Sequence, residues 1–150
     1  MAKFENDQGF FEFNLTADVG KASPNRLDDV ELVRFGYFCL GRNTQVTQIT
    51  PRLKTALQRM RSNGPHGPDL QEVIDAHQQA RGGTQDGKVS IGKAQIRKGQ
   101  SLRYDDKHSW IIYILTANMF SNNPDGFPRI DQEIDAGNAI SATVAEMFVR

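Results

Sequence analysis

The sequence contains a single cysteine, Cys39, so the chain cannot form an intramolecular disulfide. This cysteine lies in the apolar segment FGYFCLG, and free cysteine is among the residue types most often buried in protein cores. A nucleophilic cysteine needs a lowered thiol pKa and a nearby base, and the neighbouring residues in the sequence supply neither. We therefore expect Cys39 to be a small, buried core residue.

Long apolar runs and targeting signals are also missing. The longest apolar candidate, WIIYILTANMF, has 11 residues, whereas a membrane span needs about 18 or more. The N-terminal segment lacks the basic and apolar regions of a secretory signal. We therefore expect synthesis in the cytoplasm and no membrane partner. Delivery to the periplasm or the exterior stays open, through lysis or a machine that needs no cleavable signal.

Charge of one sign is not in excess. Lys and Arg together number 18, as do Asp and Glu, so the formal net charge is zero. A broad electrostatic grip on nucleic acid needs clustered positive charge, and we predict no nucleic-acid partner. The segment RLKTALQRMR nevertheless gathers Arg52, Lys54, Arg59 and Arg61. It is interpreted as a solvated face, with an acidic or phosphate-bearing partner as the alternative.

No motif for a metal or an organic cofactor occurs in the sequence. The three histidines, His66, His77 and His108, do not have the spacing of zinc ligands. Neither a Walker loop nor a Gly-x-Ser-x-Gly elbow is present. We predict no cofactor, no metal site and no catalytic residue, and we favour a protein that is not an enzyme.

Apolar periodicity interrupted by glycine and proline predicts a mainly α-helical protein. Gly41, Gly64 and Gly82 each follow an apolar stripe at helical spacing and are expected to end a helix. Asn25 and Asp69 are the expected N-caps of the first and third helices. Helices are expected at about residues 27–40, 51–63, 68–81 and 109–118, with a final one from about residue 138. For residues 109–118 the β-branched and aromatic content leaves a strand as the alternative.

Two segments suggest extended structure. GFFEFNL, which begins at residue 9, alternates imperfectly and predicts a short strand or an arm laid on the core. Asp86-Gly87 lies in a segment rich in turn residues and predicts a short β-hairpin around that turn.

Two stretches of the sequence together resemble the peptidoglycan-binding-like domain of cell-wall hydrolases and of phage- and secretion-associated proteins. The first, VGKASPNRLDDVELVRFGYFCL, begins at residue 19, and the second, VIDAHQQARGGTQDGKVSIGK, begins at residue 73. The matching positions in the first are Val19-Gly20, Asn25-Arg26, Asp29-Val30 and Leu32-Val33. Those in the second are Ile74, His77-Gln78, Gly83, Asp86-Gly87, Val89 and Gly92.

The resemblance departs from the family pattern at three places. Arg34 stands where the family has a glutamine, His77 stands where it has a phenylalanine, and Lys93-Ala94 stands where a threonine is usual. The resemblance implies a three-helix core with a short β-hairpin over residues 19–100. An arm or strand at residues 1–18 and a C-terminal helical extension at residues 101–150 are expected to complete a single domain. The resemblance also implies non-catalytic binding of cell-wall peptidoglycan.

A ligand-binding set follows from this resemblance and from the chemistry of the turn. A glutamine on the last turn of a helix can hydrogen-bond the exposed helix carbonyls or the next loop, and Gln78 has this position before the glycine stop. The predicted ligand-binding residues are Gln78, Asp86, Gly87, Tyr104 and His77. For His77, which lies on the apolar face of its helix, a buried position in the core is the favoured alternative.

The cluster YDDKHSW, residues 104–110, allows two interpretations. Asp105 and Asp106 are expected to cap the following helix, and in the alternative Tyr104 and Trp110 stack on a sugar. Paired carboxylates could also cleave a glycosidic bond, but this needs a set separation and a cleft.

Two functions therefore stand beside wall binding. The first is a protein-interaction module that docks on an effector, an immunity protein or a tail component. Arg34 and His77 suggest it, because they depart from the wall-binding family pattern, and so does the missing signal. The second is a small wall-cleaving enzyme that uses Asp105, Asp106 or a glutamate.

Overall fold

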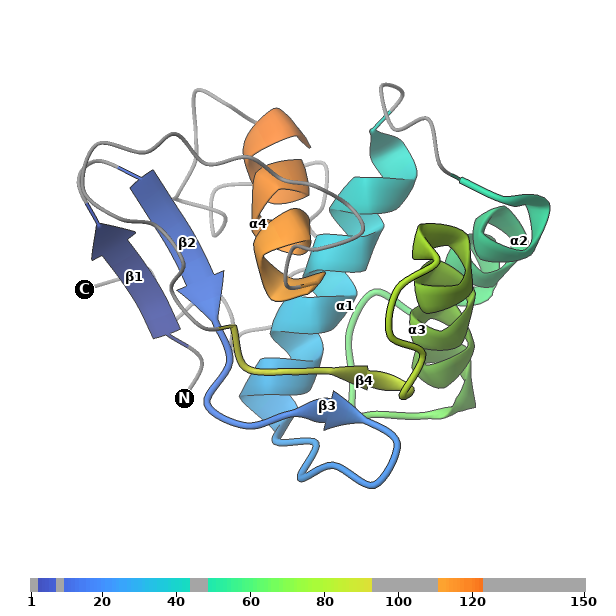
Figure 1. Ribbon diagram of the computed structural model, residues 1–150, viewed down its shortest axis with the longest axis horizontal. Coiled ribbons are helices and arrows are strands. Elements are labelled where there is room, and N and C mark those ends of the chain that lie inside the picture. Colours follow the sequence, from blue (N-terminus) through green and yellow to red (C-terminus); the bar gives the residue numbers. More distant parts are fainter. Residues whose placement is uncertain (1–2, 8–9, 44–48, 93–110, 123–150) are drawn as a thin grey trace.

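The computed structural model describes residues 3–7, 10–43, 49–92 and 111–122, which form four helices and two small antiparallel sheets (Figure 1). The helices are α1 (Leu27–Arg42), α2 (Pro51–Arg59), α3 (Pro68–Arg81) and α4 (Ile111–Asn122). Strand pairs are β1 (Lys3–Asp7) with β2 (Phe10–Asn14), and β3 (Val19–Gly20) with β4 (Lys88–Val89). The prediction of a mainly helical protein is confirmed, while the helix expected from about residue 138 lies outside the described residues.

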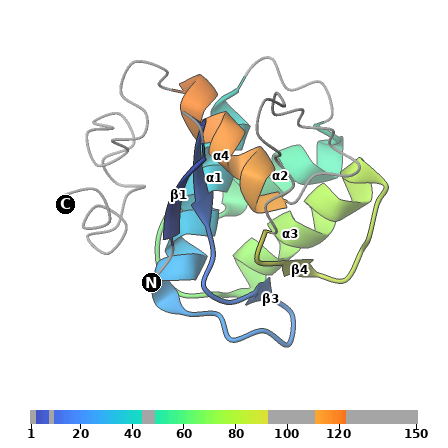
Figure 2. The same ribbon diagram turned by 60° about the vertical axis from the view of Figure 1, so that its left-hand side comes forward.

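Helix α1 is the central element of the structure. Helix α4 lies along one side of it, and α2 and α3 lie on the other, as Figure 1 and Figure 2 show. Every residue from 29 to 37 is buried, and so is Cys39, as predicted. Gly36 allows α4 to approach closely, because a Cβ atom at this position would lie 2.6 Å from the Cβ of Leu115. The burial of α1 on several sides explains why its sequence shows only a weakly amphipathic pattern.

The β1–β2 hairpin lies on the far side of α4 (Figure 1). Asn14, the last residue of β2, is buried and joins the hairpin to the segment at Gly92. The Asn14 side chain donates to the carbonyl of Gly92 and accepts from its amide, both at 2.9 Å. This amide side chain therefore forms the two hydrogen bonds that a strand neighbour would form.

Among the described residues, no helix combines the length and the apolar character required to cross a bilayer.

Helices α2 and α3 pack against each other and begin as their sequences predict. The Thr50 side chain accepts a hydrogen bond from the amide of Leu53, and proline opens both helices. Helix α3 ends at Gly82 in the left-handed conformation, with φ of 73°. Helix α2 ends at Arg59, before the expected residue 63, because the following segment is held by Arg34 and Asp69 from other helices.

Four further local predictions are wrong. Gly41 does not end α1, which continues to Arg42. The residues after the Asp86-Gly87 turn do not form a hairpin with those before it, because β4 pairs with the distant strand β3. Asn25 does not cap α1: its side chain bonds the backbone of Gly20 and Ser23 and closes the loop before the helix. Asp69 does not cap α3, because its carboxylate binds the Arg34 guanidinium.

Candidate functional site

The two short strands β3 and β4 bring together segments that lie far apart in the sequence. Val19 pairs with Val89 and Gly20 with Lys88, and the Lys21 amide donates to the Gly87 carbonyl at 3.0 Å. The contact requires glycine at position 20, where φ is +123° and a Cβ atom would lie 2.2 Å from the Gly87 oxygen. The turn at Asp86-Gly87 is thus fixed against the start of the chain segment that leads into α1.

Gln78 holds this turn from the inside. It lies on the last turn of α3, its residue surface is 3% exposed, and its Oε1 accepts from the Gly87 amide at 2.8 Å. Its Nε2 donates to Asp86 Oδ1 at 3.0 Å and to the Lys88 carbonyl at 2.9 Å. Of the two partners expected for Gln78, the helix carbonyls and the next loop, the structure shows the loop. Gln78 therefore determines the shape of the turn.

A second side chain of α3 holds the same turn from the partly exposed side. Gln71 donates through Nε2 to the Gly87 carbonyl and to Asp75 Oδ1, both at 3.0 Å. Its Oε1 lies 3.0 Å from His66 Nε2. The sequence prediction missed Gln71, although its place seven residues before Gln78 puts both amides on the same side of the helix, two turns apart.

Replacing Gln78 by methionine, which has a similar length and no hydrogen-bonding amide, is expected to lower the free energy of unfolding by about 2 kcal/mol. The Gly87 amide and the Lys88 carbonyl would then lose their partner. Urea unfolding gives the stability change, and amide hydrogen exchange at Gly87 reports the turn itself. The matched control is Gln79→Met on the exposed face of α3; equal losses in the two variants would contradict the role of Gln78.

His77 lies in the core and contacts Tyr37 across the interface of α3 with α1. The Tyr37 hydroxyl is 2.9 Å from His77 Nδ1, and the two rings meet edge to face. Burial, aided by the charge of Arg81, lowers the pKa of His77 to about 3. Burial also raises the pKa of Tyr37 far above its ordinary value. The hydroxyl therefore stays protonated and can donate a hydrogen bond to a neutral imidazole. His77 therefore has the buried position that the sequence favoured over a ligand contact.

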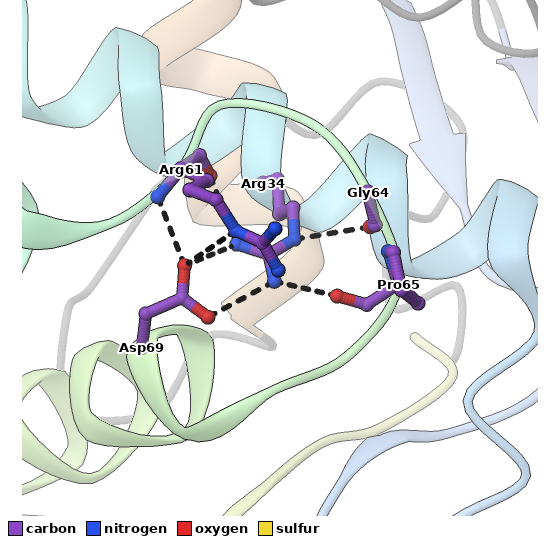
Figure 3. Close-up of polar contacts among 5 residues, drawn as sticks. All are labelled: Arg34, Arg61, Gly64, Pro65 and Asp69. Carbon is purple, nitrogen blue, oxygen red and sulfur yellow. Dashed lines mark hydrogen bonds and ion pairs between the residues drawn. The ribbon is translucent and has the colours of Figure 1, made fainter.

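Arg34 has the same structural character, which its sequence position alone did not reveal (Figure 3). The side chain is 0% exposed, and its two Nη atoms form a paired contact with the Asp69 carboxylate at 2.9 and 3.1 Å. Its remaining hydrogen bonds go to the carbonyls of Arg61, Gly64 and Pro65 at 2.9, 3.1 and 2.6 Å. The hydrogen bonds from Arg34 hold the pKa of Asp69 well below its usual range. Arg34 thus fastens the loop between α2 and α3 to α1.

The structure separates the predicted ligand-binding residues by their exposure. Asp86 is exposed, whereas Gln78, Gly87 and His77 are buried. Tyr104, like Asp105, Asp106 and the rest of its cluster, lies outside the described residues. Within the parts of the chain that are described, no three His, Cys, Asp or Glu residues gather as a metal site would require. Asp86 is therefore the described member of the predicted set that a ligand can reach directly.

Comparison with known proteins found no match: none of the family models, curated proteins or solved structures that were compared matches this chain.

Proposed function

We propose that this protein binds bacterial cell-wall peptidoglycan without cleaving it, at the surface formed by the Asp86-Gly87 turn. The proposal begins with the two sequence stretches that resemble peptidoglycan-binding-like domains. Its main support is that the parts of these stretches at residues 19–21 and 87–89 pair directly through backbone hydrogen bonds. Two motifs that were identified separately in the sequence thus form one structural unit.

The chemistry of the turn fits a sugar or peptide ligand. Asp86 presents an exposed carboxylate. Lys21, also exposed, directly follows strand β3, which pairs with β4 next to the turn. Carboxylate and ammonium groups can bond the hydroxyl, amide and carboxylate groups of wall glycan and its peptides. Because Gln78 and the Lys88 amide both bond Asp86 Oδ1, the carboxylate has a fixed direction before any ligand arrives.

Retention on purified sacculi tests the proposal. We expect the wild-type protein to co-sediment with sacculi, and Asp86→Asn to lower the binding constant about tenfold, because a charged hydrogen bond is replaced by a neutral one. Asparagine keeps the Oδ1 acceptor that the turn uses, so the fold is preserved. Glu72→Gln is the matched control and should bind like wild type, because it removes an exposed carboxylate of α3 that pairs with Arg52 and is not part of the turn.

Other outcomes would point to the two alternative functions. A folded wild-type protein that is not retained on sacculi contradicts wall binding, and a stable complex with a protein partner would then support docking. Release of soluble muropeptides by the pure protein would indicate cleavage instead of binding alone. The docking alternative was motivated by Arg34 and His77 and by the missing signal sequence. Both side chains are buried and bonded internally, so they mark no change of the protein surface.

A further inference from the structure

A cavity separate from the Asp86 turn lies between the C-terminal half of α1 and helix α2. Its volume is about 610 Å³, which falls within the usual range of small-molecule sites. The apolar lining includes Phe38, Ile49, Leu57 and Met60, all partly buried and packed against the core. These side chains offer a surface for an aliphatic or aromatic group.

Two cations line the same cavity, and none of its described lining residues is acidic. Arg42 and Lys54 are both exposed, and they reach the cavity from α1 and α2 respectively. The Arg42 guanidinium lies over the Phe38 ring, 5.4 Å from its centroid. Within the described chain, no Asp or Glu forms an ion pair with either cation. The positive charge of this cavity is therefore not compensated by the described residues around it.

In a neighbouring cavity, the positive charges are balanced by acidic side chains. It lies between α2 and α3, has a similar volume of about 600 Å³, and includes Asp69 and Glu72 in its lining. Its Arg52 is ion-paired with Glu72, and its Asp69 with Arg34. Two cavities of nearly equal size on either side of α2 thus differ in charge balance, and the α1–α2 cavity is the one suited to an anion.

We propose that the α1–α2 cavity binds a small amphipathic carboxylate. The apolar part of the ligand contacts Phe38, Leu57 and Met60, and its carboxylate accepts hydrogen bonds from Arg42 and Lys54. Charge-assisted hydrogen bonds of this kind are shorter and stronger than neutral ones, and arginine can offer two donors to one carboxylate. This site is independent of peptidoglycan binding, and it gives a binding role to Lys54, one of the four cations in the basic segment.

The test uses two carboxylates of different body, 4-phenylbutyrate and octanoate, with 4-phenylbutyramide as the neutral counterpart. In NMR titrations of the full chain, we expect at least one carboxylate to shift the amide signals of α1 and α2 around the cavity and to saturate. We expect the amide to bind about tenfold more weakly than the acid, because it lacks the charge. This comparison is made on the wild-type protein, so it does not depend on a variant that folds.

Charge variants then locate the site. Lys54→Gln and Arg42→Gln are each expected to weaken carboxylate binding about tenfold. Arg59→Gln is the matched control, since it removes an exposed cation of α2 that faces the other cavity, and its affinity should stay within about twofold of wild type. The inference is overturned if neither carboxylate gives saturable shifts, if acid and amide bind equally, or if both Lys54→Gln and Arg42→Gln bind like wild type. Sacculus retention of Lys54→Gln is measured in parallel and should be unchanged, so the two proposals can fail separately.

Discussion

Replacing Arg34 by alanine is expected to lower the free energy of unfolding by about 3–5 kcal/mol. The substitution would leave the Asp69 carboxylate without its principal partner, and three loop carbonyls without their guanidinium donor. A domain of this size is usually stable by about 5–15 kcal/mol, so the expected loss is a substantial fraction of the total stability. Urea unfolding followed by circular dichroism measures the change.

Two further variants separate the buried contact from simple loss of charge. Arg61→Ala removes a guanidinium whose side chain is 68% exposed and lies 3.9 Å from the same Asp69 oxygen, and it should cost less than about 0.5 kcal/mol. Arg34→Lys keeps the charge but loses the planar donor array, so its stability should fall between those of Arg34→Ala and wild type. A loss for Arg34→Ala as small as that for Arg61→Ala would show that the contact does not hold the loop.

Acidification is expected to destabilise the protein through His77, by about 3 kcal/mol between pH 7 and pH 4. Burial holds the pKa of His77 at about 3 in the folded state, against 6.5 for the ordinary side chain. The unfolded chain therefore takes up a proton at this residue as the pH falls below 6.5, while the folded protein does so only near pH 3. The contribution of His77 to stability is complete above pH 6.5 and is lost progressively as the pH falls toward 3.

The variant His77→Gln isolates this contribution from that of the carboxylates. Glutamine does not titrate. It can still form a hydrogen bond with the Tyr37 hydroxyl, the buried group that His77 contacts in the wild-type protein. The measured quantity is the difference between the unfolding free energies of wild type and variant at pH 7, 6, 5 and 4. This difference should shift in favour of the variant as the pH falls, and a difference that is constant with pH would contradict a buried, neutral His77.

The helices could be predicted from the sequence because their boundaries are local. Pro51 and Pro68 fix the starts of α2 and α3, and Gly82 fixes the end of α3. The early end of α2 could not be predicted in this way. Its cause is the guanidinium of Arg34, a residue of α1, which binds the Arg61 carbonyl. The pairing of β3 with β4 is equally non-local, because strands of two residues carry too little pattern to specify a distant partner.

The candidate site was predictable to a similar extent. The contact of Gln78 with the turn follows from its place before a helix stop, and the left-handed φ of 73° at Gly87 follows from its Asp-Gly sequence. Arg34 was interpreted as a change in a binding surface, because nothing beside it in the sequence shows that its partners come from residues 61–69. A departure from a family pattern can thus reflect a new internal contact and leave the surface unaltered.

The close approach of α4 to Gly36 also determines when the core can be completed during synthesis. Helix α1 leaves the ribosome long before Ile111, so the side of α1 that faces Leu115 has no covering partner while the middle of the chain is being made. The nascent chain must keep this apolar side from aggregating until α4 docks, and such long-range docking is intrinsically slow. Shortening the chain before α4 would make that transient exposure permanent.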